Sequence, residues 1–139
     1  MIYLDTAAIV KLLRPELETA ALVSWLGERS AEPLTSSTLA EVEVPRALRR
    51  ADPGRLSAVP TMLARINKIE MDATVRATAA TYADPLLRSL DAIHLASAHS
   101  VLLDSVPLAA FVTYDQRLLG AAARLGLPTA APGIEARPR

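Results

Sequence analysis

Four acidic side chains lie at or near the expected starts of helices, and two of them come just after expected strands. Asp5 and Asp115 each follow a short apolar run of β-prone residues, and Glu41 and Asp91 stand early in two segments of helical character. The carboxyl ends of parallel strands meet at one edge of a sheet, which is where open α/β proteins bind their ligands. We therefore expect Asp5, Glu41, Asp91 and Asp115 to meet at one edge of a sheet.

Clustered carboxylates of this kind favour a divalent cation, because without one they repel each other and are costly to ionise together. Oxygen ligands select hard ions such as Mg²⁺ or Mn²⁺. The chain has no cysteine, and His94 and His99 are five residues apart, which is not the spacing of a zinc-binding helix. We interpret both histidines as ordinary helix-face or core-edge residues. The chemistry that this set favours is metal-assisted hydrolysis of a phosphodiester, with a carboxylate accepting the proton of the attacking water.

Each acid also has a structural interpretation when it is taken alone. An aspartate at a helix start is a favoured N-cap and stabilises the positive end of the helix dipole, and Glu41 could lie on a solvated helix face. Capping does not predict, however, that acids follow two separate strands within apolar surroundings. The joint pattern therefore favours a site.

The composition is that of a single domain whose core is mainly aliphatic. The chain has 139 residues, of which 51% are hydrophobic, with only one Phe and one Trp. No apolar run approaches the roughly 20 residues of a membrane-spanning helix. The first residues lack the pattern of a signal peptide, and the absence of cysteine suits a reducing compartment. We expect a cytoplasmic protein with no membrane partner.

Strands and helices are expected to alternate, which predicts an α/β fold with a mainly parallel sheet covered on both faces. Pro45 lies inside one helix, where it should kink or interrupt the first turns and leaves the helical register open. Residues 131–139 contain proline and charges and are expected to form a disordered tail. The predicted strands span residues 2–4, 34–36, 69–71 and 109–113, and the predicted helices span 6–13, 16–29, 39–51, 56–66, 73–83, 89–103 and 116–125.

The net charge is zero, which by itself argues against a nucleic-acid partner. The distribution is uneven, however, because the segment from Arg46 to Lys68 holds six basic residues and Asp52 as its one acid. These basic side chains either form solvated helix faces or contact phosphates. Both interpretations remain open from the sequence.

Four segments of the chain resemble the acidic motifs of PIN domains, in the order in which that family carries them. They are Met1-Ile2-Tyr3-Leu4-Asp5-Thr6, Thr38-Leu39-Ala40-Glu41-Val42, Leu90-Asp91-Ala92-Ile93-His94-Leu95-Ala96 and Val112-Thr113-Tyr114-Asp115. The resemblance covers about residues 1–130, which we take as the PIN domain. Among PIN proteins the chain looks most like the VapC-type toxins of type II toxin–antitoxin systems.

The resemblance implies a compact α/β/α sandwich and a hydrolase that cuts RNA endonucleolytically with Mg²⁺ or Mn²⁺. Asp5 and Asp91 carry over as the firmest metal ligands and catalytic residues, and Glu41 and Asp115 as the other two acids. Thr113 matches a family hydroxyl. Glu43 is a rival for Glu41, because Pro45 leaves the register open. The family also implies a cognate VapB-type antitoxin, whose tail can place a basic side chain among the carboxylates, and a toxin homodimer.

Three other functions compete with this one. A non-catalytic PIN-like module could bind RNA or a partner protein without cutting, although a degenerate site usually lacks an acid. A phosphatase with Asp5 as nucleophile should carry a second aspartate at position 7, where Ala7 stands. A receiver-like signalling domain needs a lysine late in the chain, and no lysine follows Lys68.

Overall fold

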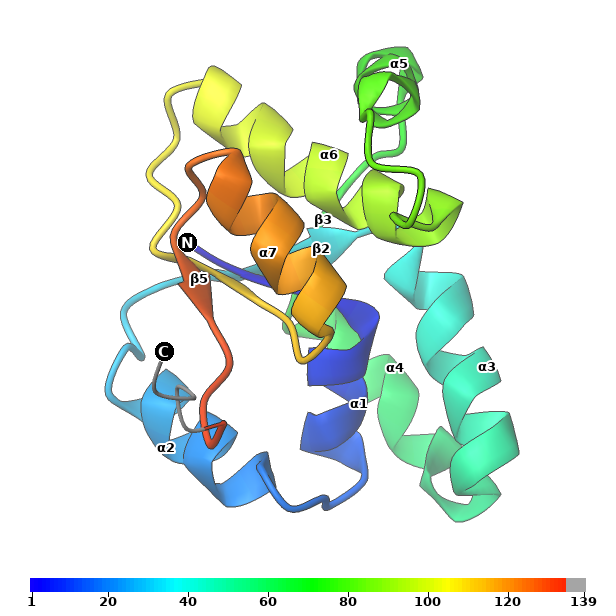
Figure 1. Cartoon of the computed structure of the whole chain (residues 1–139). Helices are drawn as coiled ribbons and strands as arrows, with labels where there is room; N and C mark the ends of the chain where they lie inside the picture. Colours follow the sequence, from blue (N-terminus) through cyan, green and yellow to red (C-terminus); the bar gives the residue numbers. More distant parts are fainter. Residues whose placement is uncertain (135–139) are drawn as a thin grey trace.

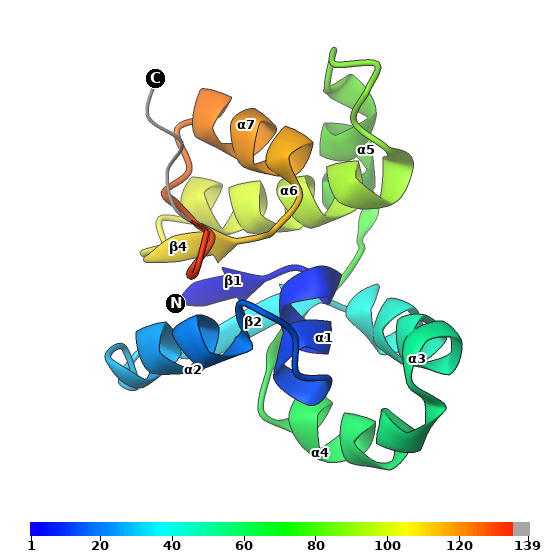
Figure 2. The same cartoon turned by 60° about the horizontal axis from the view of Figure 1, so that its bottom comes forward.

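All five strands belong to one parallel sheet with helices on both faces (Figures 1 and 2). The computed structural model describes residues 1–134. The sheet order is β3-β2-β1-β4-β5, so the first strand lies at the centre. This architecture confirms the predicted α/β/α sandwich. The strands are β1 (Ile2–Leu4), β2 (Leu34–Ser37), β3 (Asn67–Ile69), β4 (Ala110–Val112) and β5 (Thr129–Ala130).

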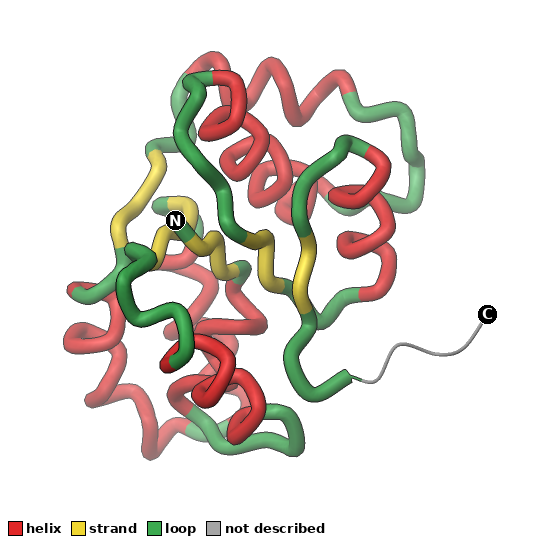
Figure 3. Tube along the Cα trace, turned by 90° about the vertical axis from the view of Figure 1, so that its left-hand side faces the viewer, coloured by secondary structure: helices red, strands yellow, loops and turns green. Residues whose placement is uncertain are grey.

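The helices divide into two layers, and Figure 3 shows the strands between them. One layer holds α1 (Thr6–Leu13), α2 (Thr19–Gly27), α3 (Ala40–Ala51), the 3₁₀ helix η1 (Pro53–Ala58) and α4 (Val59–Ala64). The other layer holds α5 (Ala73–Thr81), α6 (Ser89–Leu103) and α7 (Gln116–Arg124). No helix within residues 1–134 is long and apolar enough to cross a membrane.

The central strands supply both halves of the core because successive side chains of a strand point to opposite faces. Ile2 and Leu4 pack among the helices of the first layer, whereas Tyr3 packs with α6 and α7. In β4, Phe111 lies in the same cluster as Tyr3, and the two rings stack with centroids 5.2 Å apart. A strand buried on both faces reads as a continuous apolar run, which is why both were recognisable in the sequence.

The edge strands differ from the prediction. β3 lies at residues 67–69 rather than 69–71. It is an edge strand and includes the polar residues Asn67 and Lys68, so a search for apolar residues missed its beginning. β5 was not predicted at all. It has two residues and pairs only with β4, so it leaves no periodic signal in the sequence.

The interruption expected at Pro45 does not occur, because α3 runs without a break from Ala40 to Ala51. The expected helix at 56–66 is instead divided into η1 and α4. The expected helix at 16–29 is shorter, because the Thr19 hydroxyl donates to the carbonyl of Lys11 and accepts from the backbone N–H of Glu16, which holds the preceding residues in a turn.

The segment after β5 packs back onto the first layer. The Tyr114 hydroxyl donates to the Pro132 carbonyl at 2.9 Å, and Gly133 lies against Glu18 and Ala21 of the α2 region. Gly133 has φ of +90°, and a Cβ there would meet the Ala21 Cβ at 3.0 Å, so both backbone conformation and close approach favour glycine. Of the tail expected at 131–139, residues 135–139 lie outside the described part of the chain.

Candidate active site

Helix capping places two of the predicted acids at one edge of the sheet. Asp5 follows β1 and caps α1 by accepting from the Ala8 N–H at 2.8 Å. Asp115 follows β4 and caps α7 by accepting from the N–H groups of Arg117 and Leu118. These caps are the structural role that the sequence also allowed. The same bonds hold the two carboxylates at the carboxyl ends of neighbouring parallel strands.

A pocket of about 480 Å³ opens at this edge. Asp91 reaches it from the first turn of α6, and α1 and α3 form another part of its wall. The structure thus brings together three of the four predicted acids. The lining side chains that carry charge or a polar group are Asp5, Thr6, Lys11, Glu16, Glu43, Asp91, His94, Tyr114 and Asp115.

Glu41 does not line the pocket. It is solvent-exposed at the start of α3, whereas Glu43 faces the pocket and is half-buried. Two residues along a helix correspond to a rotation of about 200°, so only one of the two glutamates can face the other acids. The unbroken helix at Pro45 settles the register that the sequence left open, and it places Glu43 rather than Glu41 beside Asp91.

The negative charges of the pocket act on one another. Burial raises the pKa of Asp5 above its usual range, and the charge of Asp91 adds to this effect, although contacts with Thr113 and with the Ala8 N–H oppose it. Burial likewise raises the pKa of Asp91, and the nearby charges of Asp115 and Glu43 raise it further. Ionising these groups together is therefore unfavourable unless positive charge is added to the pocket.

The side chains of the pocket fit a hard divalent cation by their chemistry. Their oxygen donors are carboxylates and hydroxyls, which Mg²⁺ and Mn²⁺ prefer. Burial, with repulsion from neighbouring acids, raises the pKa of Asp5 and of Asp91, and a bound cation would oppose this effect. No group of three or more carboxylates or imidazoles within residues 1–134 is close enough to coordinate a single ion. Magnesium retains several waters in proteins and is often held by one or two carboxylates, so such an arrangement is compatible with it.

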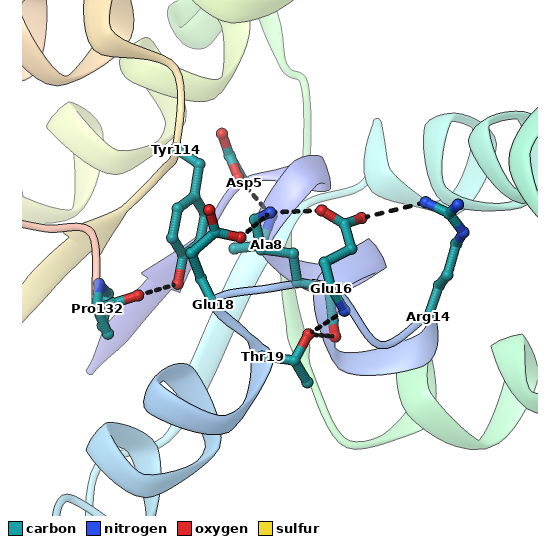
Figure 4. A network of polar contacts seen from close by, with 9 residues as sticks. Asp5, Ala8, Arg14, Glu16, Glu18, Thr19, Tyr114 and Pro132 are labelled. Atoms are coloured by element: carbon teal, nitrogen blue, oxygen red, sulfur yellow. Dashed lines mark hydrogen bonds and ion pairs between the residues drawn. The ribbon is translucent and has the colours of Figure 1, made fainter. Parts of the chain in front are cut away.

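Lys11 brings a positive charge to the wall of the pocket, and the sequence analysis did not single it out. Its ammonium donates to Glu16 and to Glu18, and it lies 4.6 Å from the centre of the Tyr114 ring. In Figure 4 dashed lines join the carboxylates of Glu16 and Glu18 to the nitrogen between them, and Tyr114 lies beside Glu18. The two glutamates already compensate this charge. The signal available in the sequence was a lysine within the otherwise apolar segment from Ala7 to Leu13.

His94 is also more than the ordinary helix residue that the sequence suggested. Only 2% of its surface is exposed, and its ring contacts Tyr3 on one side and Glu43 on the other. Burial raises the pKa of Glu43, but the hydrogen bonds from His94 and Thr6 outweigh this effect, so that the pKa of Glu43 is lowered overall. The spacing of the two histidines carried no sign of this contact, because its partners lie far away in the chain.

The fold and the acidic pocket agree with the motif order noted in the sequence, and the PIN domain family model matches residues 2–124. The chain belongs to the PIN domain family. It is 53% identical to Ribonuclease VapC35 of Mycobacterium tuberculosis (strain ATCC 25618 / H37Rv) over 134 residues, which cover 96% of this chain and 98% of the relative.

Two further similarities agree with this assignment. The chain is 41% identical to Ribonuclease VapC47 of Mycobacterium tuberculosis (strain CDC 1551 / Oshkosh) over 136 residues, or 96% of this chain and 98% of that relative. A solved structure, the crystal structure of FitAcB from Neisseria gonorrhoeae, contains a chain that superposes with a TM-score of 0.66 at 20% identity. This superposition covers 95% of the present chain and 98% of the other. At that identity it supports the fold alone.

Proposed function

We propose that this PIN-domain protein is a Mg²⁺- or Mn²⁺-dependent endoribonuclease that acts as the toxin of a toxin–antitoxin pair. The observation that carries the proposal is the pocket in which Asp5, Asp91, Asp115 and Glu43 converge at the carboxyl edge of the sheet. Two relatives that match over nearly their whole length are named ribonucleases. The proposal keeps three of the four acids expected from the sequence and replaces Glu41 by Glu43.

One or two of the carboxylates of Asp5, Asp91, Asp115 and Glu43 would bind the cation directly, and the others would act through water that the cation retains. When bound, such a cation supplies positive charge that offsets the charge developing on the phosphate and lowers the pKa of the attacking water. Both Asp5 and Asp115 are held by their helix caps, but Asp5 is buried whereas Asp115 is exposed and would lie on the side from which the substrate enters. One of these carboxylates accepts the proton of the water.

RNA would approach along α3, the helix that contributes Glu43 and Ala47 to the pocket wall. Arg46 and Arg50 follow Glu43 by three and seven residues, which places them on the same side of the helix, and both are exposed. Their charges would contact backbone phosphates rather than bases. This arrangement accounts for RNA binding by a chain whose net charge is zero.

We also propose a VapB-type antitoxin as the partner and a homodimer as the assembly, both on the basis of the family resemblance. A pocket with this concentration of carboxylates attracts cations, so an antitoxin arginine could occupy it. Such a side chain would inhibit the protein by neutralising the acids that the reaction needs.

The proposal is tested by cleavage of RNA by the purified chain, with Mg²⁺ or Mn²⁺ and with a chelator. We expect endonucleolytic products only with the cation. Asp91→Asn should abolish cleavage, whereas Asp104→Asn, at the exposed carboxyl end of the same helix, should cleave like the wild type.

Two results would contradict the proposal. Cleavage at the wild-type rate by Asp91→Asn would show that the acidic pocket is not the active site. RNA binding without cleavage under any of these conditions would instead favour the non-catalytic PIN-like module.

A further inference from the structure

A chain of hydrogen bonds runs from the buried Tyr3 to the wall of the acidic pocket. The Tyr3 hydroxyl is 2.8 Å from His94 Nδ1, and His94 Nε2 is 2.7 Å from Glu43 Oε1. The Thr6 hydroxyl donates to the same Oε1 at 2.7 Å and lies 3.1 Å from His94 Nε2. Four side chains from β1, α1, α3 and α6 are thus linked in one network that ends on a pocket carboxylate.

The chemistry of the partners determines where the imidazole carries its proton. An ionised carboxylate can only accept, so His94 Nε2 must carry the hydrogen that is donated to Glu43. Burial raises the pKa of the Tyr3 phenol well above its usual range, so the hydroxyl keeps its proton. It therefore donates a hydrogen bond to His94 Nδ1. Each polar atom of the imidazole then has a partner, and the ring has one tautomer and one orientation.

Packing restricts the ring further. Tyr3 is completely buried and meets His94 edge to face, with ring centroids 5.9 Å apart and planes at 79°. The opposite contact of Tyr3 is its stack on Phe111 of β4. The orientation of the imidazole therefore depends on the central strands of the sheet, which are buried on both faces.

Both donors contact the same oxygen of Glu43. Within the described residues, no hydrogen bond is made to the other oxygen, Oε2. A carboxylate held through one oxygen has the second free for a ligand. The side chain of Glu43 is 22% exposed, in agreement with a group that is fixed from behind and open toward the pocket.

We propose that His94 is a positioning residue that acts through Glu43. Supported by Tyr3, it donates from Nε2 to Oε1 and thereby presents Oε2 to the pocket. This inference rests on the proposed function, since it assigns Glu43 a role in metal-dependent cleavage, but it concerns a side chain that is not one of the acids of the motifs. In this proposal His94 acts through Glu43 and not directly on the substrate or the cation.

The test is a double-mutant cycle between His94 and Glu43, using His94→Leu, Glu43→Gln and the double variant. Loss of a residue that orients a ligand typically costs 10- to 100-fold, so we expect His94→Leu to lower both kcat/KM for RNA cleavage and Mn²⁺ affinity by about that factor. In the Glu43→Gln background the same substitution should change neither quantity. Additive losses would show that His94 acts independently of Glu43 and would overturn the proposal, as would wild-type values in His94→Leu.

Rescue and control variants separate positioning from a general structural role. His94→Gln places an amide N–H near the position of Nε2 and should recover most of the Mn²⁺ affinity that His94→Leu removes. His99→Leu, five residues further along α6, should behave as the wild type. Equal defects in His94→Gln and His94→Leu, in variants that retain the wild-type circular dichroism spectrum, would contradict donation to Glu43.

A third readout needs neither cleavage nor metal, and it applies even if the leucine variant does not fold. In the wild-type protein, ¹⁵N NMR of the imidazole should show a protonated Nε2 for His94, and Thr6→Val should leave it protonated. An unprotonated Nε2 overturns the positioning role. If the wild type binds Mn²⁺ and shows the expected proton but does not cleave RNA, the proposed function fails while the positioning of Glu43 stands.

Discussion

Asp5 performs two tasks that make opposite demands on its environment. As the N-cap of α1 it lies at the end of β1, where it is 5% exposed, and in the proposed function it must be ionised to bind a cation. Burial disfavours the ionised form, and the neighbouring Asp91 adds repulsion. The caps of α1 and α5 are chemically alike, since Asp72 accepts from the Val75 N–H at 2.9 Å, but Asp72 is exposed and lies outside the pocket.

We therefore predict that Asp5→Asn raises the free energy of unfolding of the metal-free protein at pH 7 by on the order of 1 kcal/mol. Asparagine preserves the cap, so only the charge is removed. Because folding raises the pKa of Asp5, the wild type loses stability as the pH rises from the unfolded-state value through the folded-state value. The gain should disappear below the unfolded-state pKa, near pH 4.

The measurement is chemical denaturation of both proteins from pH 3 to pH 8 in the presence of chelator. Asp72→Asn, at an exposed cap outside the pocket, is the matched control and should show no gain in stability at pH 7. A lower stability of Asp5→Asn than of the wild type at pH 7 would mean that its carboxylate is not under electrostatic strain.

The two glutamates of α3 give a second prediction at the scale of single residues. Glu43→Gln should lower kcat/KM for RNA cleavage by about 10²-fold or more, because the carboxylate of the pocket loses its charge. Glu41→Gln should leave it within a factor of two or so of the wild type, since Glu41 is exposed and faces away from the pocket. Single-turnover cleavage of one RNA by both variants makes the comparison. If Glu41→Gln lowered cleavage more than Glu43→Gln, Glu41 would be the catalytic glutamate, as expected from the motif.

At the scale of elements, α3 has a pocket side and a side that faces away. Glu43, Arg46 and Arg50 share the first, whereas Arg49 is rotated from Glu43 by about 120° around the helix axis. All three arginines are exposed, so substituting them should change stability little. The helix thus offers an internal comparison between basic residues that differ mainly in direction.

We predict that Arg46→Ala combined with Arg50→Ala weakens RNA binding and flattens its dependence on salt. On single-stranded RNA, the slope of log K against log salt should change by roughly 0.7 for each phosphate that the variant no longer neutralises. Arg49→Ala should have a smaller effect. Binding is measured at several salt concentrations in the Asp91→Asn background, which is expected not to cleave RNA. An unchanged slope in the double variant would favour the solvated-face interpretation of the basic segment.

At the scale of the whole molecule, the pocket is the place where metal and antitoxin would meet. If an antitoxin arginine neutralises the carboxylates, the cation and the antitoxin tail compete for the same charge. A tail that blocks RNA sterically would leave metal affinity unchanged. Linked equilibria require that each ligand weakens the other by the same factor.

We therefore expect the affinity of an antitoxin-tail peptide, measured by calorimetry, to fall as Mn²⁺ concentration rises at constant ionic strength. Mn²⁺ affinity should fall equally when the peptide is present. The same peptide with its arginine replaced by glutamine serves as the control and should show a weaker dependence on Mn²⁺. Peptide affinity that is independent of Mn²⁺ would exclude direct competition.

The sequence alone determined the central strands and the acids that follow them. Ile2–Leu4 and Ala110–Val112 are apolar on both faces, and Asp5 and Asp115 combine a strand end with a helix cap. Such signals are local, since they depend on the nearest few residues. The alternation of strands and helices then implies a parallel sheet, in which the carboxyl ends of the strands share one edge. The location of the site at one sheet edge followed from them.

Only the tertiary structure decided which glutamate joins the site and what supports it. Glu41 and Glu43 differ by two positions in one helix, and the neighbours that distinguish them lie far away in the chain. His94 is 51 residues from Glu43 and 91 from Tyr3, so no local pattern could connect the three. The same holds for β5, whose two residues become a strand only through pairing with β4. Long-range contacts of this kind form only when the elements pack. Packing buries polar groups from distant parts of the chain, and these groups then hydrogen-bond to one another.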